Sequence, residues 1–127
     1  MWSRPPLFAI LFGMTATTVW FNPNCSKCRA VREILTERGV EADYRHYLET
    51  PPTLEELARV LEGMDGTAQN ILRSKEAAYG ELGLAEATDG ECLQALTAHP
   101  ELLNRPILEH EGKSIVARPA ELALDLL

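Results

Sequence analysis

The sequence predicts an α/β fold in which a β-α-β unit and a β-β-α unit share one mixed sheet. Residues 17–21 are β-branched and aromatic, and the segment 26–38 that follows carries an apolar stripe with helical spacing. Near the C-terminus, two short apolar runs flank a turn at 111–113 and precede another helical pattern. Helix-forming patterns occupy about 53–99, so we expect a helical block inserted between the two units.

The β-α-β unit begins with the strand 17–21, which stops at Asn22-Pro23-Asn24 because proline breaks the hydrogen-bond ladder of a strand. The helix 26–38 ends before Gly39, since glycine is the residue that most readily takes the left-handed position after a helix. A second short strand is expected at 42–47.

The inserted block begins with a helix at 54–62, because Thr53 and Glu56 have the spacing of a capping box. From residue 66 to residue 99 the chain reads as helical throughout. Three glycines punctuate this stretch: Gly80, Gly83 and Gly90.

The closing unit is expected to contain strands at 107–109 and 114–117 and a last helix at 119–126, with Pro119 at its first position. This order of elements is the thioredoxin arrangement. We therefore expect residues 15–127 to form a single domain with a thioredoxin-like fold.

The first 14 residues stand apart from this pattern. Their apolar run is much shorter than the roughly 20 residues that a membrane span needs. We interpret residues 1–14 as lying outside the domain: the first thirteen are an upstream extension before the expected start of translation at Met14, or a disordered tail. A weak signal peptide is the remaining alternative.

Composition narrows the classes of partner. The chain has 127 residues and a formal net charge of −7, which disfavours nucleic acid as a partner, and we expect no membrane association either. Any anion must therefore be bound by a local cluster of arginines rather than by the overall field. Three cysteines without a disulfide-rich pattern indicate free thiols and a cytoplasmic protein.

Cys25 is the candidate nucleophile, because it follows a strand and a proline turn at the start of a helix. Free backbone N–H groups and the positive end of the helix dipole favour a thiolate there. Lys27 and Arg29 add positive charge, so the pKa of Cys25 should fall below the ~8.5 of a free thiol. Cys28 completes a C-x-x-C pattern, and it is either a resolving thiol or a buried residue of the apolar stripe.

The remaining ligand-type residues are expected to be structural or solvated. Cys92 falls on an apolar stripe of the inserted block. We predict no metal site, since the chain has no second C-x-x-C and no H-x₃₋₅-H pattern. The histidines, His46, His99 and His110, lie away from the Cys25 loop in sequence.

Five segments, in order and with consistent spacing, resemble the arsenate reductases of the glutaredoxin-linked, thioredoxin-fold type, within the arsenate reductase/Spx-type family. They are NPNCSKCR, YLETPPT, ILRSKEAAYGELGL, HPELLNRPI and VARPAELALDLL. The resemblance runs from about residue 17 to the C-terminus. It implies an enzyme that reduces arsenate to arsenite with thiols as the source of electrons.

The resemblance also implies the roles of site residues. Cys25 corresponds to the family's nucleophile, and Arg73, Arg105 and Arg118 to its three oxyanion-binding arginines. Forked guanidinium donors suit a tetrahedral oxyanion. The Arg105-Pro106 bond resembles the cis-proline of thioredoxin folds, and with Asn22 and Pro23 it is expected to shape the site. The implied enzyme is a monomer with no bound cofactor, and its donor is glutathione with glutaredoxin, or thioredoxin.

Two departures from the family leave alternatives open. Phe21 stands where family members commonly have His or Tyr, and Cys28 stands where they usually have Ser. A general thiol-disulfide oxidoreductase that uses both cysteines is one alternative. An Spx-like redox regulator that binds RNA polymerase is the other, although such regulators generally lack the R-P-x-E pattern that begins here at Arg118.

Overall fold

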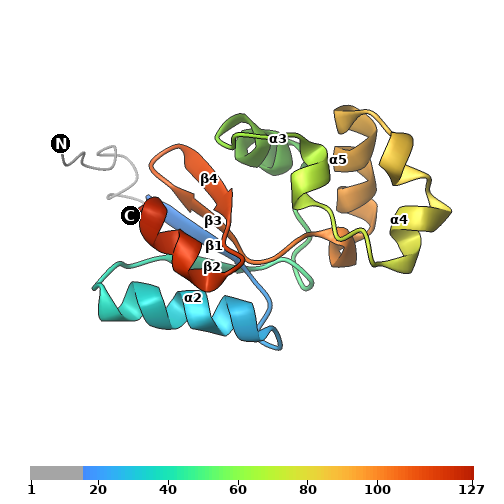
Figure 1. Ribbon diagram of the computed structural model, residues 1–127. Coiled ribbons are helices and arrows are strands. Elements are labelled where there is room, and N and C mark those ends of the chain that lie inside the picture. The colour runs from blue at the N-terminus through green and yellow to red at the C-terminus, as the bar shows by residue number, and fades with distance from the viewer. Residues whose placement is uncertain (1–15) are drawn as a thin grey trace.

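The computed structural model describes residues 16–127 and contains a four-stranded mixed sheet with the order β2-β1-β3-β4 (Figure 1). The elements β1 (Thr17–Phe21) and β2 (Asp43–His46) pair in parallel. The strand β3 (Ile107–His110) runs antiparallel to β1 and to β4 (Lys113–Val116). The predicted α/β, thioredoxin-like fold is therefore confirmed.

The expectations for residues 1–14 lie outside the described part of the chain. Within residues 16–127, no helix is both long enough and apolar enough to cross a membrane.

The two faces of the sheet are covered by different parts of the chain. The helix α2 (Ser26–Glu37) packs with the C-terminal turn η4 (Ala120–Asp125) against one face, below the sheet in Figure 1. Alternation along β1 places Val19 and Phe21 in this layer and Trp20 in the core on the opposite face. The inserted block covers that opposite face, beginning with α3 (Leu54–Glu62).

The inserted block is not helical throughout, so that prediction is wrong. After α3 it is divided into five short or medium elements: η1 (Ala68–Ile71), α4 (Ala77–Glu81), η2 (Leu84–Glu86), α5 (Asp89–Ala98) and η3 (Pro100–Leu102). Leu72 is extended and forms a bridge with Leu103, a long-range pairing that a helix would exclude. Gly83, at φ 64°, ends α4 in the left-handed conformation.

Helix caps explain where the longer helices of the block begin. The predicted capping box is present, because the Thr53 side chain accepts from the Glu56 N–H while Glu56 accepts from the Thr53 N–H. Thr88 and Glu91 cap α5 in the same way. Gly90 lies in the first turn of α5, so it does not punctuate the block as predicted.

The β3–β4 hairpin closes at Glu111-Gly112, both of which have positive φ, as a two-residue turn between twisted strands requires. β4 is an edge strand, and the Ser114 N–H donates to the carbonyl of Gly63 at 2.9 Å. The last helix predicted at 119–126 is present as a 3₁₀ helix, η4, over Ala120–Asp125. Pro119 is its extended N-cap (ψ 162°) and not its first helical residue.

Candidate active site

The loop between β1 and α2 places Cys25 at the mouth of the helix. Cys25 is the N-cap residue of α2, in extended conformation, and its N–H donates to the Asn22 carbonyl at 3.0 Å. The Asn22 Oδ1 accepts from the Asn24 N–H at 3.0 Å, and the Pro23 carbonyl accepts from Arg29 at 2.8 Å. These bonds fix the proline turn, so the position of Cys25 follows from a locally determined loop.

The environment of Cys25 favours its thiolate. Burial opposes ionisation, but the backbone N–H of Cys28, the thiol of Cys28, the backbone N–H of Lys27 and the positive charge of Arg105 together lower the pKa of Cys25. The side chain is 8% exposed, so the sulfur is sheltered without being sealed off. A sheltered thiolate at a helix start is suited to nucleophilic attack.

Cys28 has the opposite character. Burial is the main cause that raises its pKa to about 12, and the neighbouring Cys25 raises it further. It is completely buried among the apolar residues of α2, such as Val31 and Leu35. As a neutral thiol it donates a hydrogen bond to the Cys25 sulfur. The Cys28 side chain therefore fills space in the apolar core and also interacts with the nucleophile.

Arg105 has free hydrogen-bond donors, and its charge acts on this thiolate. Its Nε and Nη1 atoms are buried and have no hydrogen-bond partner among residues 16–127. Its charge lowers the pKa of both Cys25 and Cys28, so the guanidinium lies close to both sulfurs. The Arg105-Pro106 bond is cis, as the sequence predicts. Buried donors without a partner are costly unless a bound anion satisfies them.

Arg118 and Arg73 lie beside a neighbouring hollow. The Arg118 Nη1 donates to the Arg105 carbonyl at 2.9 Å, which ties the two arginines together. Arg73 forms an ion pair with Glu76 at 2.5 Å. A hollow of about 220 Å³ is lined by polar and basic residues and one leucine: Leu72, Arg73, Ser74, Lys75, Asn104 and Arg118.

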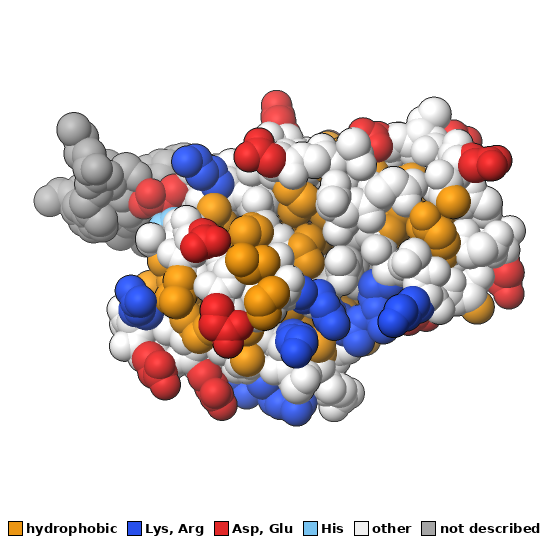
Figure 2. All heavy atoms as spheres, viewed as in Figure 1, with side chains coloured by type: hydrophobic (Ala, Val, Ile, Leu, Met, Phe, Trp, Pro, Cys, Tyr) orange, Lys and Arg blue, Asp and Glu red, His pale blue; other side chains and the backbone are white. Residues whose placement is uncertain are grey.

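The three arginines are therefore not equivalent. Arg73 and Arg118 line the 220 Å³ hollow, whereas neither Cys25 nor Arg105 is part of its lining. The charge of Arg105 acts directly on the thiolate. Arg118 is connected to Arg105 by one hydrogen bond, from its Nη1 to the Arg105 carbonyl. Figure 2 shows Lys and Arg side chains grouped in the lower middle of the visible face, between the sheet and the helical block.

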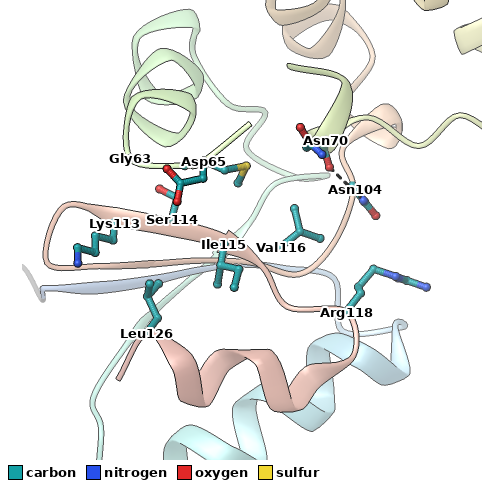
Figure 3. Close-up of a pocket in the computed structure, with 11 residues that line it drawn as sticks. Gly63, Asp65, Asn70, Asn104, Lys113, Ser114, Ile115, Val116, Arg118 and Leu126 are labelled. Carbon is teal, nitrogen blue, oxygen red and sulfur yellow. Dashed lines mark hydrogen bonds between the residues drawn. The ribbon is translucent and has the colours of Figure 1, made fainter. Parts of the chain in front are cut away.

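A larger hollow of about 580 Å³ runs along the edge strand β4 (Figure 3). It shares Arg118 and Asn104 with the smaller hollow, and Asn104 donates to the Asn70 carbonyl at its rim. Lys113 lies at its far end. Since it contains neither cysteine of the C-x-x-C pattern, its size does not make it the centre of the chemistry.

Sequence reasoning missed Tyr47 as a residue of this site. Tyr47 is 1% exposed, and its pKa is raised to about 12, chiefly by burial, while Arg105 and both sulfurs also act on it. The local signal was a tyrosine directly after a short strand, which has no distinctive meaning on its own. Only the pairing of β2 with β1 brings it to the loop.

The other ligand-type residues lie elsewhere. Cys92 is completely buried in the core of the inserted block. His110 bonds to Thr17 at 2.7 Å, His99 contacts Glu101, and His46 packs against Phe21. Within residues 16–127, no three His, Cys, Asp or Glu side chains gather closely enough to hold a metal ion.

Comparisons with known proteins match most of the chain to one family. The sequence profile of the ArsC family matches residues 20–126. The arsenate reductase of Yersinia enterocolitica is 38% identical over 116 residues, which are 90% of this chain and 82% of that protein. The arsenate reductase of Neisseria meningitidis serogroup A is 40% identical over 111 residues, covering 85% and 95%.

Two further relatives extend the comparison. The uncharacterized protein YfgD of Escherichia coli is 40% identical over 114 residues, covering 86% of this chain and 94% of its own. The solved arsenate reductase from Vibrio cholerae superposes with a TM-score of 0.80 at 33% identity, covering 89% of this chain and 98% of that one. Because both the profile and these relatives span most of the sequence, the chain belongs to the ArsC family.

Proposed function

We propose that this protein is a thiol-dependent arsenate reductase in which Cys25 is the nucleophile. The observation that carries the proposal is the pairing of a Cys25 thiol of lowered pKa with the buried, unpartnered donors of Arg105. The relatives named arsenate reductase support the choice of substrate. Arg73 and Arg118 complete the oxyanion site in this proposal, while Asn22, Pro23 and Pro106 shape it.

The chemistry proceeds by attack of sulfur on arsenic. The Cys25 thiolate forms an S–As bond with arsenate, and an arsenate oxygen takes up protons and leaves as water. A second thiol then attacks the Cys25 sulfur, so that an S–S bond forms and the S–As electron pair stays on arsenic. Arsenic is reduced from As(V) to As(III) and released as arsenite, while two thiols are oxidised to a disulfide.

The role of Arg105 in these steps is electrostatic. A guanidinium offers forked donors to two oxygens of a tetrahedral anion, and it stabilises the negative charge that the S–As adduct retains. Two of its N–H-bearing atoms are already buried and have no hydrogen-bond partner in the described part of the chain, residues 16–127, so no existing bond has to break when the anion binds.

The second thiol is either glutathione or Cys28. Glutathione would leave a mixed disulfide on Cys25 for glutaredoxin to reduce, whereas attack by Cys28 would leave an internal disulfide for thioredoxin. The hydrogen bond from the Cys28 thiol to Cys25 supports the internal route, because the two sulfurs are already in contact. The raised pKa of Cys28 means that it reacts only after its proton has been removed.

Cys25→Ser tests the proposed nucleophile. We expect arsenate-dependent oxidation of the thiol donor to fall to the uncatalysed rate, because a hydroxyl is not ionised at neutral pH. Cys92→Ser is the control, since Cys92 is buried far along the chain in another core, and it should retain turnover. Normal turnover by Cys25→Ser would end the proposal.

Cys28→Ser with two donor systems tests the resolving thiol. If Cys28 is in the cycle, the thioredoxin-coupled rate is lost while the rate with glutathione and glutaredoxin remains. Equal rates for wild type and variant in both systems would show that Cys28 has only a packing role.

The three free cysteines also support a reducing compartment, and we propose a monomer in the cytoplasm.

A further inference from the structure

Tyr47 lies beside the loop that carries Cys25, although it belongs to another strand. It follows directly after β2, and the parallel register pairs Phe21 of β1 with His46 of β2. The next residues along the two chains, Asn22 and Tyr47, therefore lie side by side where both strands end. The phenol ring is buried on the same face as Trp20.

The hydroxyl of Tyr47 contacts the polar side chain of Asn22. Burial raises the pKa of Tyr47 and the Asn22 amide opposes that rise, so the polar groups of the two neighbouring side chains interact. The Asn22 Oδ1 also accepts from the Asn24 N–H, so one amide links the phenol to the turn of the loop. Removing the hydroxyl would leave this amide held from the loop side alone.

Asn22 in turn holds the loop at three other points. Its carbonyl accepts from the Cys25 N–H, and its Oδ1 accepts from the Asn24 N–H. Its backbone N–H donates toward the sulfur of Cys28. The Cys28 thiol donates onward to Cys25, so a chain of polar contacts runs from Tyr47 through Asn22 and Cys28 to the nucleophile.

We infer that Tyr47 is a positioning residue, which acts through Asn22 to keep the donors of the loop aimed at the Cys25 thiolate. The inference rests on the proposed function for the use of that thiolate, and it adds a residue that secures its reactivity. Three other groups face Cys25: Cys28 from α2, Arg105 from the segment before β3, and the backbone of Lys27. Tyr47, which follows β2, acts through Asn22 on the first of these groups, Cys28.

The role requires a neutral phenol, and burial provides one. Burial raises the pKa of Tyr47 to about 12, so the hydroxyl stays protonated at every pH at which the enzyme would work. The amide contact is therefore present whether Cys25 is a thiol or a thiolate, and any pH dependence of Cys25 reflects Cys25 itself.

Tyr47→Phe tests the inference, because it removes the hydroxyl and keeps the ring in its packed position. Alkylation of Cys25 by iodoacetamide, located by mass spectrometry, is followed as a function of pH. We expect its midpoint to move upward by roughly 0.7 pH unit, because loss of one hydrogen bond loosens the donors that stabilise the thiolate. The thermal melting temperature is measured on the same samples.

Tyr44→Phe is the matched control. Tyr44 lies on β2 itself and packs in the core on the opposite face of the sheet, where its ring and that of Phe21 meet edge to face at 5.4 Å between centroids. Removing its hydroxyl should leave the alkylation midpoint of Cys25 unchanged. Asn22→Ala should shift the midpoint upward, and adding Tyr47→Phe to it should shift it no further, since both act through one contact.

Two results would overturn the inference. One is a Tyr47→Phe protein that melts at a lower temperature but keeps the wild-type alkylation midpoint, which would leave Tyr47 a packing residue. The other is a shift that adds in full to that of Asn22→Ala. Alkylation needs no arsenate, so a wild type without arsenate turnover would contradict the proposed function while leaving this question open to the same measurement.

Discussion

Cys25 and Cys28 lie three residues apart, but burial separates the chemistry of their thiols. Cys25 sits at the start of α2, where backbone N–H groups without helical partners lower its pKa. Cys28 lies one turn further along, under the sheet, where its pKa is raised to about 12. Two cysteines one helical turn apart therefore differ in chemistry: Cys25 is the nucleophile, and Cys28 keeps its proton.

Apart from the nucleophile Cys25, Arg105 is the residue whose removal should affect this site most. We expect Arg105→Gln to lower kcat/KM for arsenate by about 100-fold, the usual effect of losing a donor to a developing anion. The pKa of Cys25 should rise as well, because a nearby positive charge favours the thiolate. Both are measured, by arsenate-dependent thiol oxidation and by the pH dependence of alkylation.

A matched charge change away from the site serves as the control for Arg105. Arg38 is exposed at the far end of α2, so Arg38→Gln removes the same charge without touching the loop. It should change neither quantity. A wild-type kcat/KM for Arg105→Gln would contradict the assignment of its free donors to the substrate.

At the level of elements, α3 and α5 begin where a side chain satisfies one of their first N–H groups. α3 and α5 each begin with a threonine–glutamate capping box, while α2 begins with a cysteine that caps nothing. The N–H groups at the start of α2 are left available for the sulfur, so the missing cap of α2 belongs to the site.

The cap of α3 gives a prediction about stability. Thr53→Ala removes the acceptor for the Glu56 N–H and should cost about 1 kcal/mol. We expect the melting temperature to fall by about 4 °C, measured by circular dichroism. Thr36→Ala is the comparison, because Thr36 is exposed inside α2 and bonds only back to the Arg32 carbonyl. A loss of equal size in both variants would refute the capping explanation.

At the scale of the whole molecule, the charge is divided unevenly. The chain has a net charge of −7, yet the hollow beside the site is lined by three basic residues, Arg73, Lys75 and Arg118, and by no acidic residue. The overall charge repels an approaching anion, whereas these three side chains attract it. The local field, rather than the overall one, therefore determines where an oxyanion binds.

Lys75 tests this division of charge. We expect Lys75→Gln to raise the KM for arsenate about threefold in dilute buffer, because an exposed charge near the anion contributes modestly. The effect should shrink in about 1 M salt, where screening acts within a few ångströms. Lys113→Gln makes the same charge change at the far end of the larger hollow, and an equal effect there would show that net charge alone is responsible.

The parts of the structure that local sequence determines were predictable, and those that depend on pairing were not. Cys25 could be placed from a strand, a proline turn and a helix start that are adjacent in sequence. The place of Tyr47 depends on the β1–β2 register, and the break at Leu72 on a bridge to Leu103, which no local pattern encodes. The free donors of Arg105 likewise result from distant packing.

The contact between Gly63 and β4 also bears on how the molecule avoids self-association. An open edge strand is a template on which another chain can add, but here the loop after α3 occupies one of its N–H groups. A Cβ at position 63 would lie 2.6 Å from the Gly112 carbonyl oxygen, so only glycine lets the loop come so near. A bulkier residue at position 63 would push the loop away from β4 and expose the Ser114 N–H, so that another chain could pair with the strand and start aggregation.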